Sequence, residues 1–236
     1  MIAIDENMHN HSLSRCRPLR STGMSDEAPS TPDLRLRTTP TQARSQESFN
    51  KILDATAALL DEVGLDGMST NLVAERAGVR VRTVYRYFPN KHALVAALFR
   101  RQTRQANRIL LFGVGKLADR DRCWKEAIRA LVADYFAATL ESPGWLTVRR
   151  TVMASPAFGE LAREAVVEPT KALEEVLARR GVTVPRARLA IVTELVQQMS
   201  TAGVDLAVRH RRAQRQVIVE ELGNALVRYL APVVDG

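Results

Sequence analysis

Apolar residues recur at helical spacing along most of the chain, and short polar or glycine-containing segments separate these stretches. The first strong pattern runs from Arg44 to Val63 and is followed by Gly64, a residue type that commonly comes after a helix C-terminus. About 20 residues at about 1.5 Å each predict an amphipathic helix roughly 30 Å long. Its inward-facing positions keep three- and four-residue spacing: Phe49, Ile52, Leu53, Thr56, Leu59, Leu60 and Val63.

Two shorter helices are predicted within residues 69–92, on either side of Gly78. Ser69 is a suitable N-cap for the first of them. In the second, Val84 and Phe88 lie on one side, while arginines and a tyrosine lie on another. A helix of about two turns is unstable alone in water, so both must pack against the preceding helix. This is the arrangement of a helix-turn-helix motif, whose second helix enters the DNA major groove.

Six further helices are predicted after this motif. Gly113 and Gly115 are expected to end the first of the six, and Pro169 is expected to kink or divide the fourth. No strand pattern or internal repeat appears, so the predicted fold class is all-α. The predicted helices cover residues 91–112, 120–141, 145–154, 155–180, 186–208 and 212–231.

The patterns predict three regions. Residues 1–43 are rich in Ser, Thr and Pro and are expected to form a flexible basic tail, of which residues 1–23 are expected to be dispensable. Residues 44–92 are expected to form a three-helix head that is too small to be very stable alone. Residues 93–236 are expected to form a larger helical domain.

The charge balance favours an anionic partner. Lys and Arg outnumber Asp and Glu by 34 to 26, a formal net charge of +8, which favours nucleic acid or a membrane surface. No apolar run approaches the roughly 18 to 20 residues that a membrane span needs. The N-terminus lacks the apolar segment of a secretory signal, and the two cysteines form no disulfide framework. We therefore expect a cytoplasmic protein with no membrane partner.

The helix-turn-helix segment is more basic than the chain as a whole. Charge alone would fit a solvated basic face equally well. The ordered succession of cap, helix, glycine, helix, aromatic pair and proline favours DNA binding. Five basic residues across 69–92 face the single acid Glu75, a net charge of 5 − 1 = +4: Arg76, Arg80, Arg82, Arg86 and Lys91.

The same segment resembles the N-terminal region of the TetR (AcrR-type) transcriptional repressors. The resemblance covers roughly residues 44–98 and is carried by two runs, KILDATAALLDEVGLDGMSTNLVAERAG and AGVRVRTVYRYFPNKHAL. Arg80 stands where a Ser or Thr often caps the recognition helix, and Arg82 where the residue is often small, which leaves the operator sequence open. The resemblance implies a homodimer on a pseudo-palindromic operator in double-stranded DNA. It also implies an inducer pocket among the helices before the final pair.

Exposure on the predicted helices and the match to the motif together indicate the DNA contacts. The start of the first short helix can hold a phosphate with amides and hydroxyls. Arg82, Thr83 and Arg86 are expected at base edges, and the tyrosines and Lys91 at the DNA backbone. The predicted DNA-binding residues are Ser69, Thr70, Asn71, Arg80, Arg82, Thr83, Tyr85, Arg86, Tyr87 and Lys91.

The C-terminal part supplies a predicted ligand pocket and a predicted dimer contact. Large aromatic residues concentrate in the middle helices and either fill a core or line an apolar pocket with a few polar groups. The ligand-binding residues expected on the second interpretation are Phe112, Trp124, Tyr135, Trp145 and Phe158. Small residues beside larger apolar ones on the last two helices predict the dimer interface: Met199, Gly203, Leu206, Leu222 and Leu226.

No catalytic constellation, metal motif or cofactor motif is present in the sequence. We therefore expect no enzyme, no catalytic residue, no metal and no cofactor. The predicted function is a ligand-responsive, dimeric, DNA-binding transcriptional regulator, a repressor released from its operator by a small apolar ligand. Two alternatives stay open: an activator with the same head, and an all-α enzyme or interaction module whose basic face is incidental.

Overall fold

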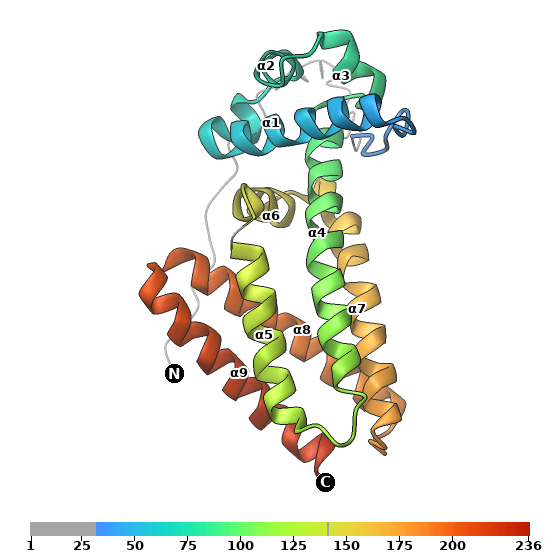
Figure 1. Ribbon diagram of the computed structural model, residues 1–236, viewed down its shortest axis with the longest axis vertical. Coiled ribbons are helices and arrows are strands. Elements are labelled where there is room, and N and C mark those ends of the chain that lie inside the picture. Colours follow the sequence, from blue (N-terminus) through green and yellow to red (C-terminus); the bar gives the residue numbers. More distant parts are fainter. Residues whose placement is uncertain (1–31, 141) are drawn as a thin grey trace, which may run out of the picture. The chain divides into compact units, whose positions relative to one another are not determined.

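The computed structural model describes residues 32–140 and 142–236, except the side chains of Val208 and Arg212. Within this part of the chain there are nine α-helices, one 3-10 helix and no strand, which confirms the all-α class (Figure 1). The helices are α1 (Ala43–Gly67), α2 (Thr70–Arg76), α3 (Val81–Tyr87), α4 (Lys91–Lys116), α5 (Trp124–Leu140), α6 (Trp145–Ala154), η1 (Pro156–Phe158), α7 (Gly159–Arg179), α8 (Arg186–Arg209) and α9 (Arg212–Val234).

Most helix boundaries follow the sequence pattern, with differences at α4, α5 and α7. Gly64 has a positive φ of 69°, so the helical conformation of α1 is interrupted where the sequence predicts. Gly113 and Gly115 do not end α4, which continues to Lys116 because neither glycine adopts the positive φ of a helix terminus. Helix α5 begins at Trp124, whereas the sequence pattern predicts a start at residue 120. Pro169 does not divide α7, which runs through it.

One hydrophobic cluster joins α1, α2, α3 and the beginning of α4. Phe49 of α1 stacks on Phe88 with ring centroids 5.1 Å apart and meets Tyr87 edge-on at 5.4 Å. The same cluster takes in Val148 and Val152 of α6 and Phe158 of η1. The first turns of α4 are fully inside it, since every residue from Ala93 to Phe99 is buried. The helix-turn-helix therefore shares its core with α4 and α6, and the division at residues 92 and 93 stays a prediction.

A second hydrophobic cluster lies among the end of α4 and helices α5, α7, α8 and α9. Trp124, Ile128, Val132 and Phe136 of α5 face this cluster. It also contains buried residues of the last two helices, among them Leu189, Val192, Val196, Val204, Leu226 and Leu230. Because α4 contributes to both clusters, it connects the helix-turn-helix to the C-terminal helices (Figure 1).

The beginning of α6 packs directly against α1. Gly144 has a φ of 68°, and a Cβ atom added to it would lie 2.9 Å from Cβ of Ala57. The hydroxyl of Thr147 donates to Asp61 of α1. Glycine is required at position 144 because both its backbone conformation and its distance from α1 exclude a side chain. No helix in the described part of the chain is both long enough and apolar enough to cross a membrane.

Candidate nucleic-acid interface and ligand cavity

One face of α3 is fixed in the core and the other is exposed. Val84, Tyr87 and Phe88 are buried, with 0%, 1% and 0% of their surface exposed. The opposite face carries the exposed side chains of Arg82 and Arg86. A short helix fixed on one side in this way presents its other face in a defined orientation, as recognition of a DNA groove requires.

Helix α2 is joined to α3 by side-chain hydrogen bonds. The Ser69 hydroxyl caps α2 by accepting from the Leu72 amide at 3.2 Å. The hydroxyls of Thr70 and Tyr85 are 2.8 Å apart, which links the start of α2 to the middle of α3. Asn71 is exposed beside them. The N-terminus of α2 therefore presents hydroxyls next to the arginines of α3.

Two of the five basic residues in this segment have partners within the fold. Arg76 forms a two-pronged ion pair with Glu62 of α1, with N–O distances of 2.6 and 2.7 Å. Hydrogen bonding from Arg76 lowers the pKa of the Glu62 carboxyl. The ammonium of Lys91 donates to the Leu65 carbonyl at the end of α1, at 2.9 Å.

The other three basic residues, Arg80, Arg82 and Arg86, are exposed and form no ion pair among the described residues. Their charges are therefore free to meet an anion.

An extended segment before α1 lies along the same face. The backbone amide of Arg37 donates to the Tyr87 carbonyl at 2.9 Å, and its guanidinium donates to the Tyr85 carbonyl at 3.2 Å. Arg100 of α4 donates to the Leu34 carbonyl at 3.0 Å. Hydrogen bonds therefore connect Leu34 and Arg37 to α4 and α3, and the boundary of the tail at residue 43 stays a prediction. Residues 1–31, including the stretch expected to be dispensable, lie outside the described residues.

A mostly apolar cavity lies among α4, α5, α7, α8 and α9, far along the sequence from the basic face. Its volume is about 90 Å³. The apolar walls include Leu110 and Val114 of α4 and Leu173 of α7. Polar groups are few and come from five side chains besides that of Tyr135: Thr170, Thr193, Gln197, Ser200 and Thr201. This composition suits a small apolar ligand that makes a few specific hydrogen bonds.

Comparison with known proteins decides the family. Residues 52–98 match the family model described as bacterial regulatory proteins of the tetR family, and residues 123–230 match a tetracyclin repressor-like C-terminal domain. A TetR-family transcriptional regulator from Streptomyces coelicolor is 32% identical, with a TM-score of 0.59, over 81% of this chain and 100% of that chain. The chain belongs to the TetR family. The family is one of regulatory proteins, which confirms the prediction of a regulator rather than an enzyme.

Other relatives of this TetR-family chain differ in how much they cover. The repressor KstR from Rhodococcus jostii is 52% identical over 56 residues, which are 23% of this chain and 26% of that protein. The chain thus matches only about a quarter of the length of that curated relative. FadR from Bacillus subtilis, solved in complex with stearoyl-CoA, is 17% identical with a TM-score of 0.60, over 77% of this chain and 97% of that chain, a likeness in fold alone.

Two predicted DNA contacts of this TetR-family chain need correction. Tyr87 was expected at the DNA backbone, but it is a core residue that packs against Phe49 and Phe88. Its position three residues after Val84, on the buried face of α3, was the signal that could have shown this. Lys91 was also expected at the backbone, but its ammonium donates to carbonyls at the end of α1. The remaining eight residues lie on or beside the exposed face of α2 and α3 and stay predictions.

The two tyrosines of α3 give a direct test of this correction. Tyr85 is 41% exposed and bonds to Thr70, whereas Tyr87 is 1% exposed. Tyr85→Phe should weaken binding to the preferred duplex by about 1 kcal/mol, roughly fivefold, because it removes one exposed hydrogen-bonding group. Tyr87→Phe should leave the DNA dissociation constant unchanged. Fluorescence anisotropy with a labelled duplex measures both, and a loss confined to Tyr87→Phe would contradict the assignment.

Only part of the predicted ligand set lines the cavity. Tyr135 is in its wall, and Trp145 borders a smaller neighbouring cavity. Phe112 is 68% exposed and lies under the Lys116 ammonium, so it faces away from the cavity.

The two remaining members of that set are core residues. The indole of Trp124 is buried and donates to Asp235 at 2.8 Å, so it belongs to the core of the C-terminal helices. Phe158 is fully buried in the cluster of the helix-turn-helix, beside His92. These three predictions, Phe112, Trp124 and Phe158, are therefore corrected.

The predicted dimer residues mix inner and outer positions of α8 and α9. Leu226 is only 2% exposed and lines the cavity, so it cannot reach a second chain. Gly203 and Leu222 pack against each other within one chain, since a Cβ on Gly203 would lie 2.6 Å from a Leu222 methyl group. Met199 is partly buried in the second cluster. Of the predicted set, Leu206 is the clearly exposed member, at 40%.

The exposed apolar residues of the last two helices are absent from the predicted set. Ile191 and Leu195 of α8 are 56% and 43% exposed, and Val217 of α9 is 58% exposed. Ile191, Leu195 and Leu206 are separated by 4 and 11 residues, which places them on one side of a helix. This second apolar stripe, beside the inner one through Val192 and Val196, was the signal that could have identified them.

Proposed function

We propose that this chain is a homodimeric repressor that binds operator DNA and releases it when a small apolar ligand enters the cavity. The observation that carries the proposal is the exposed face of α3, where Arg82, Arg86 and the N-cap residue Arg80 have no ion-pair partner among the described residues. Unpaired arginines on a rigidly held helix suit guanine edges and phosphates. The repressors among the relatives support the direction of regulation.

Different side chains take different parts in the proposed DNA contact. Arg82 and Arg86 lie where a helix in the major groove meets base edges. Ser69 and Thr70, at the N-terminus of α2, suit a phosphate of the adjacent backbone. Arg35 and Arg37, in the segment held beside α3, are exposed and can reach the same duplex. Phosphate contacts fix the register, and base contacts supply the specificity.

The proposed dimer forms through the outer faces of α8 and α9. One helix-turn-helix covers one half-site, so a pseudo-palindromic operator needs a second copy related by two-fold symmetry. Ile191, Leu195, Leu206 and Val217 provide exposed apolar surface on these faces. Helices α8 and α9 also pack on each other, so two copies of the pair would make a four-helix bundle.

The proposed ligand response depends on α4. Leu110 and Val114 of α4 line the cavity, and the first turns of the same helix are buried in the cluster that holds α3. A ligand that moves the end of α4 would therefore change the position of the recognition helix. It can release DNA only through a difference in affinity between the two arrangements. Tenfold weaker operator binding requires about 1.4 kcal/mol of such coupling.

Selection from random duplexes, followed by binding and transcription assays, tests the proposal. The selected sequences should share a pseudo-palindrome, and deletion of the gene should raise expression from a reporter controlled by that sequence. A fall in expression on deletion would indicate the activator instead. Absence of any preferred duplex would favour the interaction module. Apolar compounds that quench tryptophan fluorescence should also lower operator affinity; quenching without DNA release would leave a ligand cavity with no part in regulation.

A further inference from the structure

A smaller cavity of about 50 Å³ adjoins the apolar one and has a different chemistry. The two cavities share wall residues on four helices, namely Leu110, Tyr135, Pro169 and Gln197. The smaller cavity is also lined by Thr103, Trp145 and Arg149. Each of these three side chains has a buried polar atom with no hydrogen-bond partner among the described residues: Thr103 Oγ1, Trp145 Nε1 and Arg149 Nη2.

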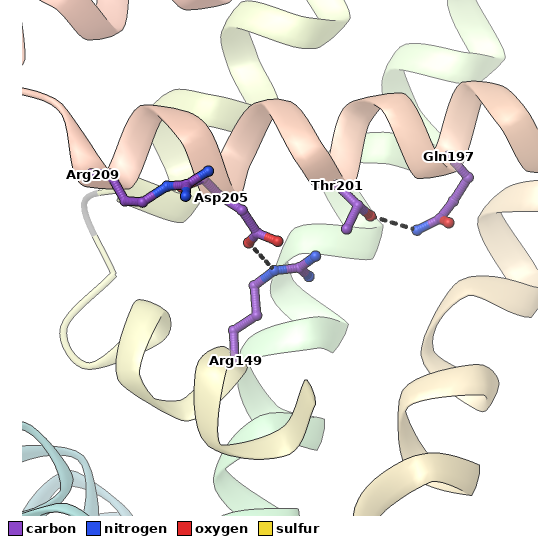
Figure 2. Close-up of polar contacts among 5 residues, drawn as sticks. All are labelled: Arg149, Gln197, Thr201, Asp205 and Arg209. Atoms are coloured by element: carbon purple, nitrogen blue, oxygen red, sulfur yellow. Dashed lines mark hydrogen bonds and ion pairs between the residues drawn. The ribbon is translucent and has the colours of Figure 1, made fainter. Parts of the chain in front are cut away.

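Arg149 is the most unusual of the three. Its side chain is only 9% exposed, and its Nε donates to Asp205 Oδ1 of α8 at 3.0 Å (Figure 2). Asp205 satisfies one edge of the guanidinium and leaves Nη2 without an acceptor. A buried donor atom of a charged group that lacks an acceptor costs more free energy than one of a neutral group. Such an atom beside a cavity indicates a site for an acceptor from outside the chain.

We propose that the two cavities bind an amphipathic carboxylic acid, with its carboxylate at Arg149 and Trp145 and its apolar tail in the larger cavity. A carboxylate has two acceptor oxygens and can accept from both donors, with the Thr103 hydroxyl available as a third. This inference names the ligand class of the cavity in the proposed function, but it does not depend on the release of DNA.

The other groups around the smaller cavity agree with a carboxylate. No Asp or Glu lines it, so its wall offers no carboxylate to a cationic head group. Burial raises the pKa of the Tyr135 hydroxyl, which therefore stays protonated and neutral beside the cavity. Gln197 borders both cavities, and its side-chain amide donates to the Thr201 hydroxyl of the same helix, α8, at 3.0 Å (Figure 2).

Direct binding of decanoate and 1-decanol tests the inference, because the two probes differ only in the head group. In a Trp124→Phe background Trp145 is the single remaining tryptophan, so its fluorescence reports on the smaller cavity. Decanoate should change this fluorescence and bind more tightly than 1-decanol. Arg149→Met should weaken decanoate binding by roughly ten- to a hundredfold, the value of a hydrogen bond to a charged group, and change 1-decanol binding little.

Asp205→Asn separates a ligand contact from a purely structural ion pair. Both Arg149→Met and Asp205→Asn break the same ion pair, so a structural role predicts the same effect from each. A ligand contact predicts opposite effects, because removing Asp205 leaves Arg149 with uncompensated positive charge and should strengthen decanoate binding by roughly two- to fivefold. Asp205→Asn also keeps the test open if Arg149→Met fails to fold. Arg150→Met, at an exposed neighbouring position, is the matched control and should leave both affinities unchanged.

Three results would overturn the inference: no decanoate binding, equal binding of both probes, or parallel losses in Arg149→Met and Asp205→Asn. The proposed function can fail independently of this inference about the ligand. If decanoate binds as described and operator affinity does not change, the ligand class stands and the regulatory response is wrong. If other compounds release the operator while decanoate does not bind, the response stands and the carboxylate site is wrong.

Discussion

A chain in which Arg82 and Arg86 are both replaced by alanine is expected to bind its preferred duplex hardly better than random DNA. Both side chains are exposed on α3 and form no ion pair among the described residues. Each arginine that reads a base edge contributes about 1 to 3 kcal/mol of discrimination, so the pair contributes about 2 to 6 kcal/mol per half-site. Fluorescence anisotropy on selected and scrambled duplexes, at one fixed salt concentration, measures the difference.

The matched control replaces Arg104 and Arg108 by alanine. These residues are also exposed and lie on α4, and their replacement removes the same number of charges. This control should weaken all duplexes slightly and equally, because it changes only the long-range field. If the α3 variant weakens selected and scrambled duplexes by the same factor, then Arg82 and Arg86 contact phosphates and the assignment to base edges is wrong.

The elements of the fold were predictable because each has a local signal. Gly64 has the positive φ that its place after the first pattern indicates. Ser69 caps α2 as predicted, and Pro143 with Gly144, residue types that commonly interrupt helices, precedes α6. Asn90, between α3 and α4, caps α4 by accepting from the Ala93 amide at 2.9 Å. Each of these signals acts over a few residues, so no knowledge of the partner helices is needed.

Residue roles that depend on packing between helices were harder to predict. Tyr87 and Tyr85 are the same residue type two positions apart, and only the side on which α3 packs makes one a core residue and the other a surface residue. The concentration of aromatic residues in the middle helices, together with the family resemblance, assigns Trp124 and Trp145 to one pocket. In the structure Trp124 bonds to Asp235 and Trp145 borders the smaller cavity, because α5 and α6 turn them toward different neighbours.

The contacts of Arg149 had no signal in the sequence. Helical spacing places Arg149, unlike Arg150, on the side of α6 that carries Trp145 and Val152, but it does not show what the guanidinium contacts. Its importance depends on Asp205, which is 56 residues away in the sequence. A buried charge is recognisable only when the elements around it are assembled, so the smaller cavity could not have been predicted.

A chain carrying Leu195→Asp and Leu206→Asp is expected to be monomeric and to lose most of its operator affinity. These side chains are 43% and 40% exposed on the outer face of α8, so charges there should leave the fold of one chain intact. Charges at Met199 or Leu222 would be a poorer test, because both residues pack inside one chain. Two linked helix-turn-helix motifs bind a pseudo-palindrome more tightly than one by about 10²- to 10⁴-fold, and the monomer loses this gain.

Sedimentation velocity at micromolar concentration should show the change in mass, and anisotropy on full and half-site duplexes should show the loss of bivalent binding. The matched control is Phe112→Asp with Val167→Asp, two exposed apolar residues at 68% and 45% on α4 and α7 that receive the same charges. It should remain a dimer with unchanged affinity, because neither residue lies on α8 or α9. A dimeric α8 variant with full affinity for the pseudo-palindrome would place the interface elsewhere. Burying a charge in an apolar contact without a partner costs several kcal/mol, so a true interface could not tolerate two of them.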